Sequence, residues 1–298
     1  MLSFRAFVAA LRPHQWTKNL LIFAPLALSK HLFEADAFLS ASLAFALFCG
    51  LSGTVYLIND LADLERDRLH PKKRLRPLAS GALSVSAARA AAVLLGLLCL
   101  GLSAFLGGAF LATAAAYVVL NLLYSYSLKH VVILDVISIS LGFVLRAVAG
   151  AVAISVHFSD WLVVCTLLLA VFLALAKRRH ELVTLAGTDH REILAEYSPY
   201  LLDQMIAVVT ASCLMAYVFY TLAPETVEKY RTDRLAFTIP FVLYGIFRYL
   251  YLVHGKEEGG SPTDLLLTDR PLLADVALWA AALVTIVYTA GGAPAARN

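Results

Sequence analysis

The chain has 298 residues, of which 60% are hydrophobic and only 15% are charged. Soluble domains carry about 25% charged residues, and the mean hydropathy here is +0.77. These values exclude a cytosolic enzyme, a disordered protein and a disulfide scaffold. They predict an all-α, polytopic membrane protein that forms one integral membrane domain over residues 1–298 and has no nucleic-acid partner.

The apolar runs define the expected elements in chain order. Residues 1–18 have apolar side chains at helical spacing among Arg5, Arg12 and Lys18, with Trp16 near the end, which predicts an interfacial amphipathic helix. Pro25 is expected to kink the first, short span. Nine spans are predicted within residues 20–290: 20–33, 37–59, 85–106, 108–126, 131–156, 160–176, 203–223, 235–254 and 271–290.

The distribution of basic residues predicts the orientation. Of the 24 Lys and Arg residues, 18 fall in 1–18, 60–89, 127–130, 177–202 and 248–270, which lie on one side of a nine-span chain. Lys and Arg are enriched in cytoplasmic loops. The N-terminus is therefore expected in the cytoplasm and the C-terminus outside, in the cell (inner) membrane. Because the unusual polar motifs share the cytoplasmic side, an enzyme acting on a membrane lipid is favoured over a transporter, whose ionisable groups lie nearer the midplane.

Four oxygen-bearing side chains mark the end of the second span. Asn59, Asp63 and Asp67 follow one another at four-residue spacing, and Asp60 lies three residues before Asp63, so a helix brings all four to one face. A few hard oxygen ligands beside water suit Mg²⁺ that is also held by substrate phosphates. The cluster therefore predicts a magnesium site that stabilises a leaving diphosphate. The alternative is a solvated acidic helix end paired with nearby arginines.

A basic loop follows the acidic cluster at once. Lys73, Arg74 and Arg76 lie in the segment HPKKRLRPLASG at residues 70–81. Such side chains bind phosphate oxygens, two prolines stiffen the loop and Gly81 lets it turn. Acidic helix end and basic loop together predict a cradle for a magnesium–diphosphate group, and an ordinary positive-inside loop is the alternative.

Other cationic and polar groups stand at the ends of spans or within them. Arg146 lies deep in the fifth span, where a charge costs at least about 2.5 kcal/mol and requires an anionic partner, either a carboxylate or a substrate phosphate. Asp135 begins the same span but is 11 residues away. The remaining candidates for substrate binding are Lys18, Asn19, Tyr124, Lys129, Lys177 and Arg178, for which interface anchoring is the alternative.

These motifs, taken in order, resemble the UbiA superfamily of intramembrane prenyltransferases, and in detail its branch of decaprenyl-phosphate phosphoribosyltransferases. The resemblance covers nearly the whole chain and implies a nine-helix bundle around a cavity open to lipid. The motifs that carry it are Asn59-Asp60-x-x-Asp63-x-x-x-Asp67, Arg12-Pro13-x-Gln15-Trp16-x-Lys18-Asn19, Asp67-Arg68-x-His70-Pro71-x-Lys73-Arg74-x-Arg76-Pro77, Tyr124-Ser125-x-x-Leu128-Lys129, Gly142-Phe143-x-x-Arg146, Lys177-Arg178 and Asp269-Arg270-Pro271.

That branch implies a specific reaction. The donor is 5-phosphoribosyl 1-diphosphate (PRPP), the acceptor is a polyprenyl (decaprenyl) phosphate, and the diphosphate leaves. Mg²⁺ is expected on Asn59, Asp63 and Asp67, with Asp60 as a further candidate ligand. The second Asp-rich motif of the aromatic prenyltransferases is replaced here by the basic segment 177–181, so a second magnesium–diphosphate clamp is not expected.

Two further hypotheses remain open. One is a prenyltransferase that moves a polyprenyl group from its diphosphate to an aromatic or haem-precursor acceptor, against which the basic segment 177–181 argues. The other is a transporter or lipid-binding scaffold without catalysis. Gly101, Ala104, Gly107 and Gly108 permit close helix packing, which allows a homo-oligomer.

Overall fold

The architecture is entirely helical over the residues that the computed structural model describes, which are 4–71, 73–157, 159–184, 192–256 and 262–291. The long helices are α3 (Ala35–Ala62), α5 (Val85–Ser103), α6 (Gly108–Tyr126), α7 (Leu134–Ala153), α8 (Asp160–Thr184), α9 (Pro199–Leu222), α11 (Ile239–Gly255) and α13 (Arg270–Thr289). The short helices are α1 (Phe4–Ala10), α2 (Ala24–Leu28), α4 (Leu64–Leu69), α10 (Pro224–Tyr230) and α12 (Pro262–Thr268). The 3₁₀ helices are η1 (Pro13–Phe23), η2 (Lys73–Leu75), η3 (Ala104–Leu106), η4 (Leu128–His130), η5 (Glu192–Glu196) and η6 (Arg234–Thr238).

Eight helices of the described chain are long and apolar enough to cross a membrane, so the predicted count of nine spans is not confirmed. The difference lies at residues 20–33, where η1 ends at Phe23 and the five-residue α2 begins at Ala24. Pro25 stands in the first turn of α2. Because proline lacks an N–H and clashes with the preceding turn, an α-helix begins at this point and does not run through it.

The N-terminal segment is also divided. The expected helix over residues 1–18 is represented by α1, which ends at Ala10, and by η1, which begins at Pro13. Between them Arg12 adopts the left-handed conformation, with φ of 51°. A left-handed residue cannot continue a right-handed helix, so the chain turns here and η1 enters the bundle. Residues 1–3 lie outside the described part.

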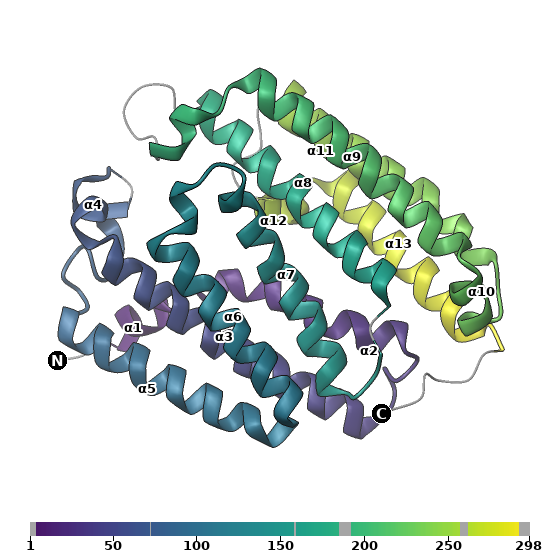
Figure 1. Cartoon of the computed structure of the whole chain (residues 1–298), viewed down its shortest axis with the longest axis horizontal. Coiled ribbons are helices and arrows are strands. Elements are labelled where there is room, and N and C mark those ends of the chain that lie inside the picture. Colours follow the sequence, from purple (N-terminus) through teal and green to yellow (C-terminus); the bar gives the residue numbers. More distant parts are fainter. Residues whose placement is uncertain (1–3, 72, 158, 185–191, 257–261, 292–298) are drawn as a thin grey trace.

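The long helices run side by side (Figure 1). Helices α3, α5 and α6 form one side of the bundle, α9, α11 and α13 form the other, and α7 and α8 lie between them. Helix α3 and helix α7 have 61% of their most apolar window buried, whereas α5 and α13 have 17%. Exposed leucine and phenylalanine side chains on the outer helices are what a lipid-facing surface requires, so the chain is a multi-pass membrane protein.

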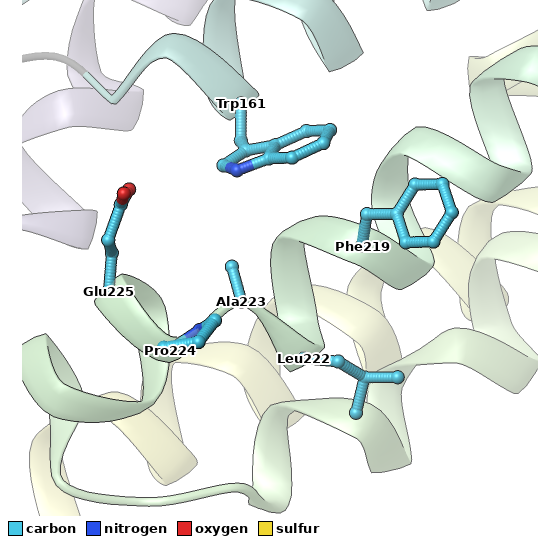
Figure 2. A pocket seen from close by; sticks show the side chains of 6 residues that line it. All are labelled: Trp161, Phe219, Leu222, Ala223, Pro224 and Glu225. Carbon is cyan, nitrogen blue, oxygen red and sulfur yellow. The ribbon is translucent and has the colours of Figure 1, made fainter.

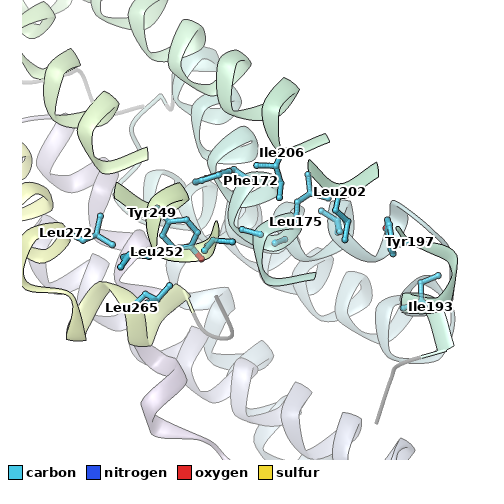
Figure 3. Close-up of a cluster of buried hydrophobic side chains, with 14 residues drawn as sticks. Phe172, Leu175, Ile193, Tyr197, Leu202, Ile206, Tyr249, Leu252, Leu265 and Leu272 are labelled. Atoms are coloured by element: carbon cyan, nitrogen blue, oxygen red, sulfur yellow. The ribbon is translucent and has the colours of Figure 1, made fainter. Parts of the chain in front are cut away.

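Two apolar cores meet at α7. The first joins α8, α9, α11, α12 and α13 around Phe172, Leu202, Tyr249 and Leu272 (Figure 3). The second joins α3, α5, α6, α7 and η1 around side chains such as Phe48. One core lies in each half of the bundle, and α7 contributes side chains to both. Polar side chains of α7 can therefore contact helices of either half.

The backbone of η1 packs directly against α7. A Cβ atom added at Gly150 of α7 would lie only 2.1 Å from the carbonyl oxygen of Ile22. Only glycine at this position lets the two backbones lie so close together. The close packing of η1 against α7 places Lys18 and Asn19, both in η1, inside the bundle.

Candidate functional site

The acidic motif remains helical across a break between α3 and α4. Helix α3 ends at Ala62 and α4 begins at Leu64, yet the Asp63 N–H donates to the Asn59 carbonyl at 2.9 Å. The Asp67 N–H likewise donates to the Asp63 carbonyl at 2.8 Å. These two bonds keep Asn59, Asp63 and Asp67 one turn apart along the same helical path, as their spacing predicts.

Cations from three other segments contact the carboxylates. Arg12 forms an ion pair with Asp60. The Arg76 Nη1 atom lies 3.2 Å from the Asp60 Oδ1 atom and 2.5 Å from the Asp67 Oδ2 atom. Asp60 and Asp67 are both only 3% exposed. The basic loop is thus folded back onto the acidic helix end, and its arginine neutralises two buried carboxylates.

The fourth contact comes from α6 and η4. The Lys129 Nζ atom lies 2.7 Å from the Asp63 Oδ1 atom. Lys129 follows Tyr124, which is half-buried on the last turn of α6. Lys129, a candidate for substrate binding from the sequence, thus lies against the acidic helix end.

The donor chemistry fits a magnesium ion. One oxygen of Asp60 and one of Asp67 converge on the same cationic nitrogen of Arg76, so this helix end already brings carboxylates around a positive charge. Across the described ranges no three His, Cys, Asp or Glu side chains are arranged as a metal site, because the carboxylates are turned toward Arg12, Arg76 and Lys129. Carboxylate and amide oxygens next to phosphate-binding cations are the set that Mg²⁺ takes in proteins.

The rest of the basic loop lies at the surface. Lys73 is half-buried and Arg74 is exposed, and both lie in η2. The Lys73 backbone N–H donates to His70 Nδ1 at 3.2 Å, which ties the start of η2 to the preceding turn. Gly81 has a φ of 80°, a conformation that glycine adopts readily, and the loop turns there as expected. Lys72 lies outside the described residues.

Arg146 is buried in the middle of the bundle and bonds only to neutral acceptors in the described structure. Its Nε atom donates to Asn19 Oδ1 at 2.7 Å, its Nη1 atom to the Gly142 carbonyl at 2.8 Å, and its Nη2 atom to the Tyr117 hydroxyl at 2.8 Å. The Ser52 hydroxyl contacts Tyr117 at 3.2 Å. Asn19 and Arg146 therefore belong to one site. Of the two anionic partners expected for Arg146, a carboxylate or a substrate phosphate, the carboxylate is not among these acceptors.

Lys18 brings a second positive charge to this region. Burial, together with the positive charges of Lys177, Arg146 and Arg12, lowers the pKa of Lys18 to about 7, while Asp264 opposes the shift. Within the described part of the chain its amino group makes no hydrogen bond or ion pair. Lys18 and Arg146 are thus two neighbouring basic groups that form no ion pair with a carboxylate among the described residues.

Arg178 has a different environment. It is 1% exposed, and its Nε atom lies 3.4 Å from Asp135 Oδ2 while its Nη1 atom bonds Glu181. The Tyr197 hydroxyl donates to Asp135 Oδ1 at 2.8 Å. Asp135 is thus the partner of Arg178 and not of Arg146. Lys177 lies 3.9 Å from Glu181, so the end of α8 is held by carboxylates of its own and of α7.

Several residues of the site were not predicted from the sequence. Arg12 is 48 residues from Asp60, and Tyr117 is 29 residues from Arg146. Ser52 and Tyr117 are hydroxyl groups inside apolar spans, which is the signal that could have marked them. Arg12 had no comparable local signal.

A hollow at the opposite end of the bundle contains none of these residues. It lies between the first turn of α8 and the junction of α9 with α10 (Figure 2), and it is lined by Trp161, Phe219, Leu222, Ala223, Pro224 and Glu225. Its walls are apolar apart from Glu225. This hollow therefore lies apart from the acidic helix end and from the cations in the centre of the bundle.

The chain belongs to the UbiA prenyltransferase family, whose sequence profile matches residues 20–260. It is therefore a membrane-embedded transferase. It is 34% identical over 293 residues to a decaprenyl-phosphate phosphoribosyltransferase of Corynebacterium glutamicum, covering 94% of this chain and 86% of that protein. It is 32% identical over 294 residues to the protein of that name in Mycolicibacterium smegmatis, covering 94% and 92%. These matches confirm the family resemblance predicted from the motifs.

The fold agrees with this assignment. The structure of a UbiA homolog from Archaeoglobus fulgidus bound to DMAPP and Mg²⁺ superposes with a TM-score of 0.73 at 21% identity. The superposition covers 95% of this chain and 99% of that one. The helical UbiA fold is therefore shared over nearly the whole length.

Proposed function

We propose that the protein transfers the 5-phosphoribosyl group of PRPP to a polyprenyl phosphate and releases diphosphate in a magnesium-dependent reaction. The observation that carries the proposal is the presence of two adjoining charged regions. One is the acidic helix end with its basic loop, and the other is the set of cations around Lys18 and Arg146. Two anionic substrates need two such regions. The names of the relatives at 32–34% identity support the same reaction.

The acidic helix end is proposed to take the donor. Asn59, Asp63 and Asp67 would hold Mg²⁺, which when bound neutralises the diphosphate as it leaves. Lys73, Arg74, Arg76 and Lys129 would bind diphosphate oxygens that the metal does not contact.

The central cations are proposed to take the acceptor phosphate. Lys18, Arg146 and Lys177 supply positive charge, and Asn19 orients the Arg146 guanidinium through its 2.7 Å bond. Tyr124 would contribute a hydroxyl at the edge of this region. Arg178 would act through position, because its carboxylate partners fix the end of α8 that carries Lys177.

The chemistry needs little beyond positioning and charge. A phosphate oxygen of the lipid forms a bond to the anomeric carbon while the bond from that carbon to the diphosphate oxygen breaks, and the diphosphate leaves with the electron pair. The attack comes from the opposite face, so the anomeric configuration inverts. The lipid phosphate is already ionised near pH 7, so no general base is required, and orientation with charge stabilisation supplies the catalysis.

The orientation follows from the same charges. With the basic loops in the cytoplasm, the N-terminus and the site face the cytoplasm, in the cell (inner) membrane. PRPP would then reach the site from water and the polyprenyl phosphate from the bilayer. Residues 101–108 would allow assembly into a homo-oligomer.

The test is a transfer assay with purified protein. Radiolabelled PRPP, Mg²⁺ and a polyprenyl phosphate are expected to give label in the organic phase, and EDTA is expected to abolish it. Label that appears instead from a radiolabelled polyprenyl diphosphate and an aromatic acceptor would replace this proposal with a prenyltransferase. The variants Asp63→Asn and Asp67→Asn are expected to remove metal-dependent turnover.

A further inference from the structure

The carboxylates of the acidic helix end are not equivalent. The Oδ1 atom of Asp60 contacts two guanidinium groups, Nη2 of Arg12 and Nη1 of Arg76, the latter at 3.2 Å. The side chain of Asp60 is 3% exposed, whereas that of Asp63 is 24% exposed and bonds a lysine. Asp60 is thus buried beneath two arginines, and Asp63 is open to the site.

Asp60 stands at the edge of the acidic helix face that is farthest from Asn59. Asn59, Asp63 and Asp67 repeat every four residues, while Asp60 lies one residue after Asn59 and is rotated about 100° around the axis. It lies about 60° from Asp63 and about 20° from Asp67 around that axis, so it shares the Asp67 side of the helix, where Arg76 contacts both carboxylates. From this edge the Asp60 carboxylate contacts Arg12 as well as Arg76.

Arg12 is fixed in an unusual way. Its backbone is left-handed, with φ of 51° and ψ of 64°, a conformation that non-glycine residues seldom adopt and that concentrates at functional sites. Its guanidinium lies 4.7 Å from the centre of the Tyr56 ring, one turn before Asp60 on α3. The backbone turn, the ring and the carboxylate together hold the guanidinium in one place.

We propose that Asp60 is a positioning residue and not a metal ligand: it fixes Arg12 and Arg76 as a pair of guanidiniums that bind the diphosphate beside the metal. This inference rests on the proposed function and adds Arg12 to the diphosphate-binding groups. A guanidinium has five N–H donors, so the bond to Asp60 through one nitrogen leaves donors for phosphate oxygens. Asp60 thereby sets the direction in which the two arginines present them.

The experiment separates metal binding from diphosphate binding. Mn²⁺ binding is measured by electron paramagnetic resonance, and inorganic diphosphate binding by isothermal titration calorimetry at saturating Mn²⁺. Asp63→Asn is expected to weaken Mn²⁺ binding at least tenfold. Asp60→Asn is expected to leave Mn²⁺ affinity within twofold and to weaken diphosphate binding at least tenfold. Arg68→Gln, which removes an exposed pair with Glu65, is the matched control and is expected to change neither.

Two results would overturn the proposal. Loss of Mn²⁺ affinity in Asp60→Asn equal to that in Asp63→Asn would make Asp60 a ligand. Unchanged diphosphate affinity in Asp60→Asn would show that the ion pairs of Asp60 with Arg12 and Arg76 do not contribute to diphosphate binding. Neither measurement requires turnover, so both remain decisive if PRPP is not the donor. Where turnover is found, Asp60→Asn is expected to raise KM for PRPP with little change in kcat, which a general loss of structure would not produce.

A coupling measurement provides the second route. Arg12→Gln alone is expected to weaken diphosphate binding, and the double variant Arg12→Gln/Asp60→Asn is expected to bind no more weakly than Asp60→Asn alone. Additive losses would contradict the positioning role, because independent contacts add. If Asp60→Asn fails to fold, as judged by thermal unfolding, Arg12→Gln still tests the proposal, and unchanged diphosphate affinity in it would overturn it.

Discussion

Two buried arginines of this protein sit in contrasting surroundings. Arg178, at the end of α8, is paired with Asp135 and Glu181, so its charge is balanced within the fold. Arg146, in the middle of α7, bonds an amide, a carbonyl and a hydroxyl, none of which carries a charge. Both are at most 6% exposed. The first arrangement is a structural ion pair, and the second fits the proposed binding of an anionic substrate.

The contrast shows why burial alone does not identify a substrate-binding cation. Removing a charge from water is costly unless it is paired. Arg178 meets that requirement inside the protein. The guanidinium of Arg146 donates hydrogen bonds to three neutral acceptors, but no anion among the described residues balances its charge. Lys18 is a second basic group nearby. A phosphate that enters between them would supply what the protein itself does not.

The largest effect is expected when the ion pair between Arg178 and Asp135 is broken. Arg178→Gln leaves Asp135 buried without its cation, and removal of one partner of a buried ion pair costs about 3–5 kcal/mol. The variant is expected to lose that much stability in denaturant unfolding in detergent. Arg179→Gln, which breaks a more exposed pair with Asp203, is the control and is expected to cost about 1 kcal/mol or less. Equal losses in the two variants would contradict the assignment.

The next largest effect is expected when the charge of Arg146 is removed. Arg146→Gln is expected to lower kcat/KM for polyprenyl phosphate about 100-fold, which corresponds to about 2.7 kcal/mol of lost transition-state stabilisation. Steady-state kinetics at saturating PRPP measure it. Tyr117→Phe removes one bond to Arg146 but keeps its charge, so a smaller loss is expected. Wild-type kinetics in Arg146→Gln would show that this arginine is structural after all.

The third effect is expected when η1, which carries Asn19, is displaced from α7. Gly150→Val places side-chain atoms against the Ile22 carbonyl, where even a Cβ would lie at 2.1 Å. Overpacking of this kind costs about 1–3 kcal/mol. We expect a lower unfolding midpoint together with a reduced affinity for polyprenyl phosphate. Gly101→Val, where a Cβ meets nothing within 4 Å, is the control. Reduced stability without any change in affinity would separate η1 from the acceptor site.

The smallest effect concerns pH. The pKa of Lys18 is about 7, against an ordinary value of 10.5, and Lys177, Arg146, Arg12 and Asp264 are the charged groups that act on it. Because the protonated form attracts phosphate, affinity for polyprenyl phosphate is expected to fall severalfold between pH 6 and 8.5. Lys18→Gln is expected to bind more weakly at pH 6 and to flatten the profile. The titration of the lipid phosphate is common to both proteins, so identical profiles would contradict the role of Lys18.

The folding stability of the ligand-free protein is expected to change with pH in the opposite direction to the affinity for polyprenyl phosphate. The unfolded chain keeps Lys18 protonated up to its ordinary pKa of 10.5, whereas the folded protein releases that proton near pH 7. Where the unfolded state binds more protons, stability rises with pH. The ligand-free protein is therefore expected to gain stability between about pH 7 and 10.5, relative to Lys18→Gln.

Local features of this protein were determined by the sequence itself. The four-residue spacing of Asn59, Asp63 and Asp67 sets their alignment, because helical hydrogen bonds are local and persist across the junction at Asp63. The positions of eight apolar helices follow from hydropathy. The run at residues 20–33 is not confirmed as a span, because hydropathy does not register the proline at which the α-helix begins anew.

The partners of the charged groups were decided by the tertiary structure. Asp135 lies in the same helix as Arg146 but pairs with Arg178 of the next helix, and Asp60 meets Arg12 across 48 residues of chain. Such pairings depend on the direction in which each side chain leaves its helix and on which helices lie side by side. Electrostatic attraction acts through space and not along the chain, so only the packed bundle distinguishes the balanced arginine from the unbalanced one.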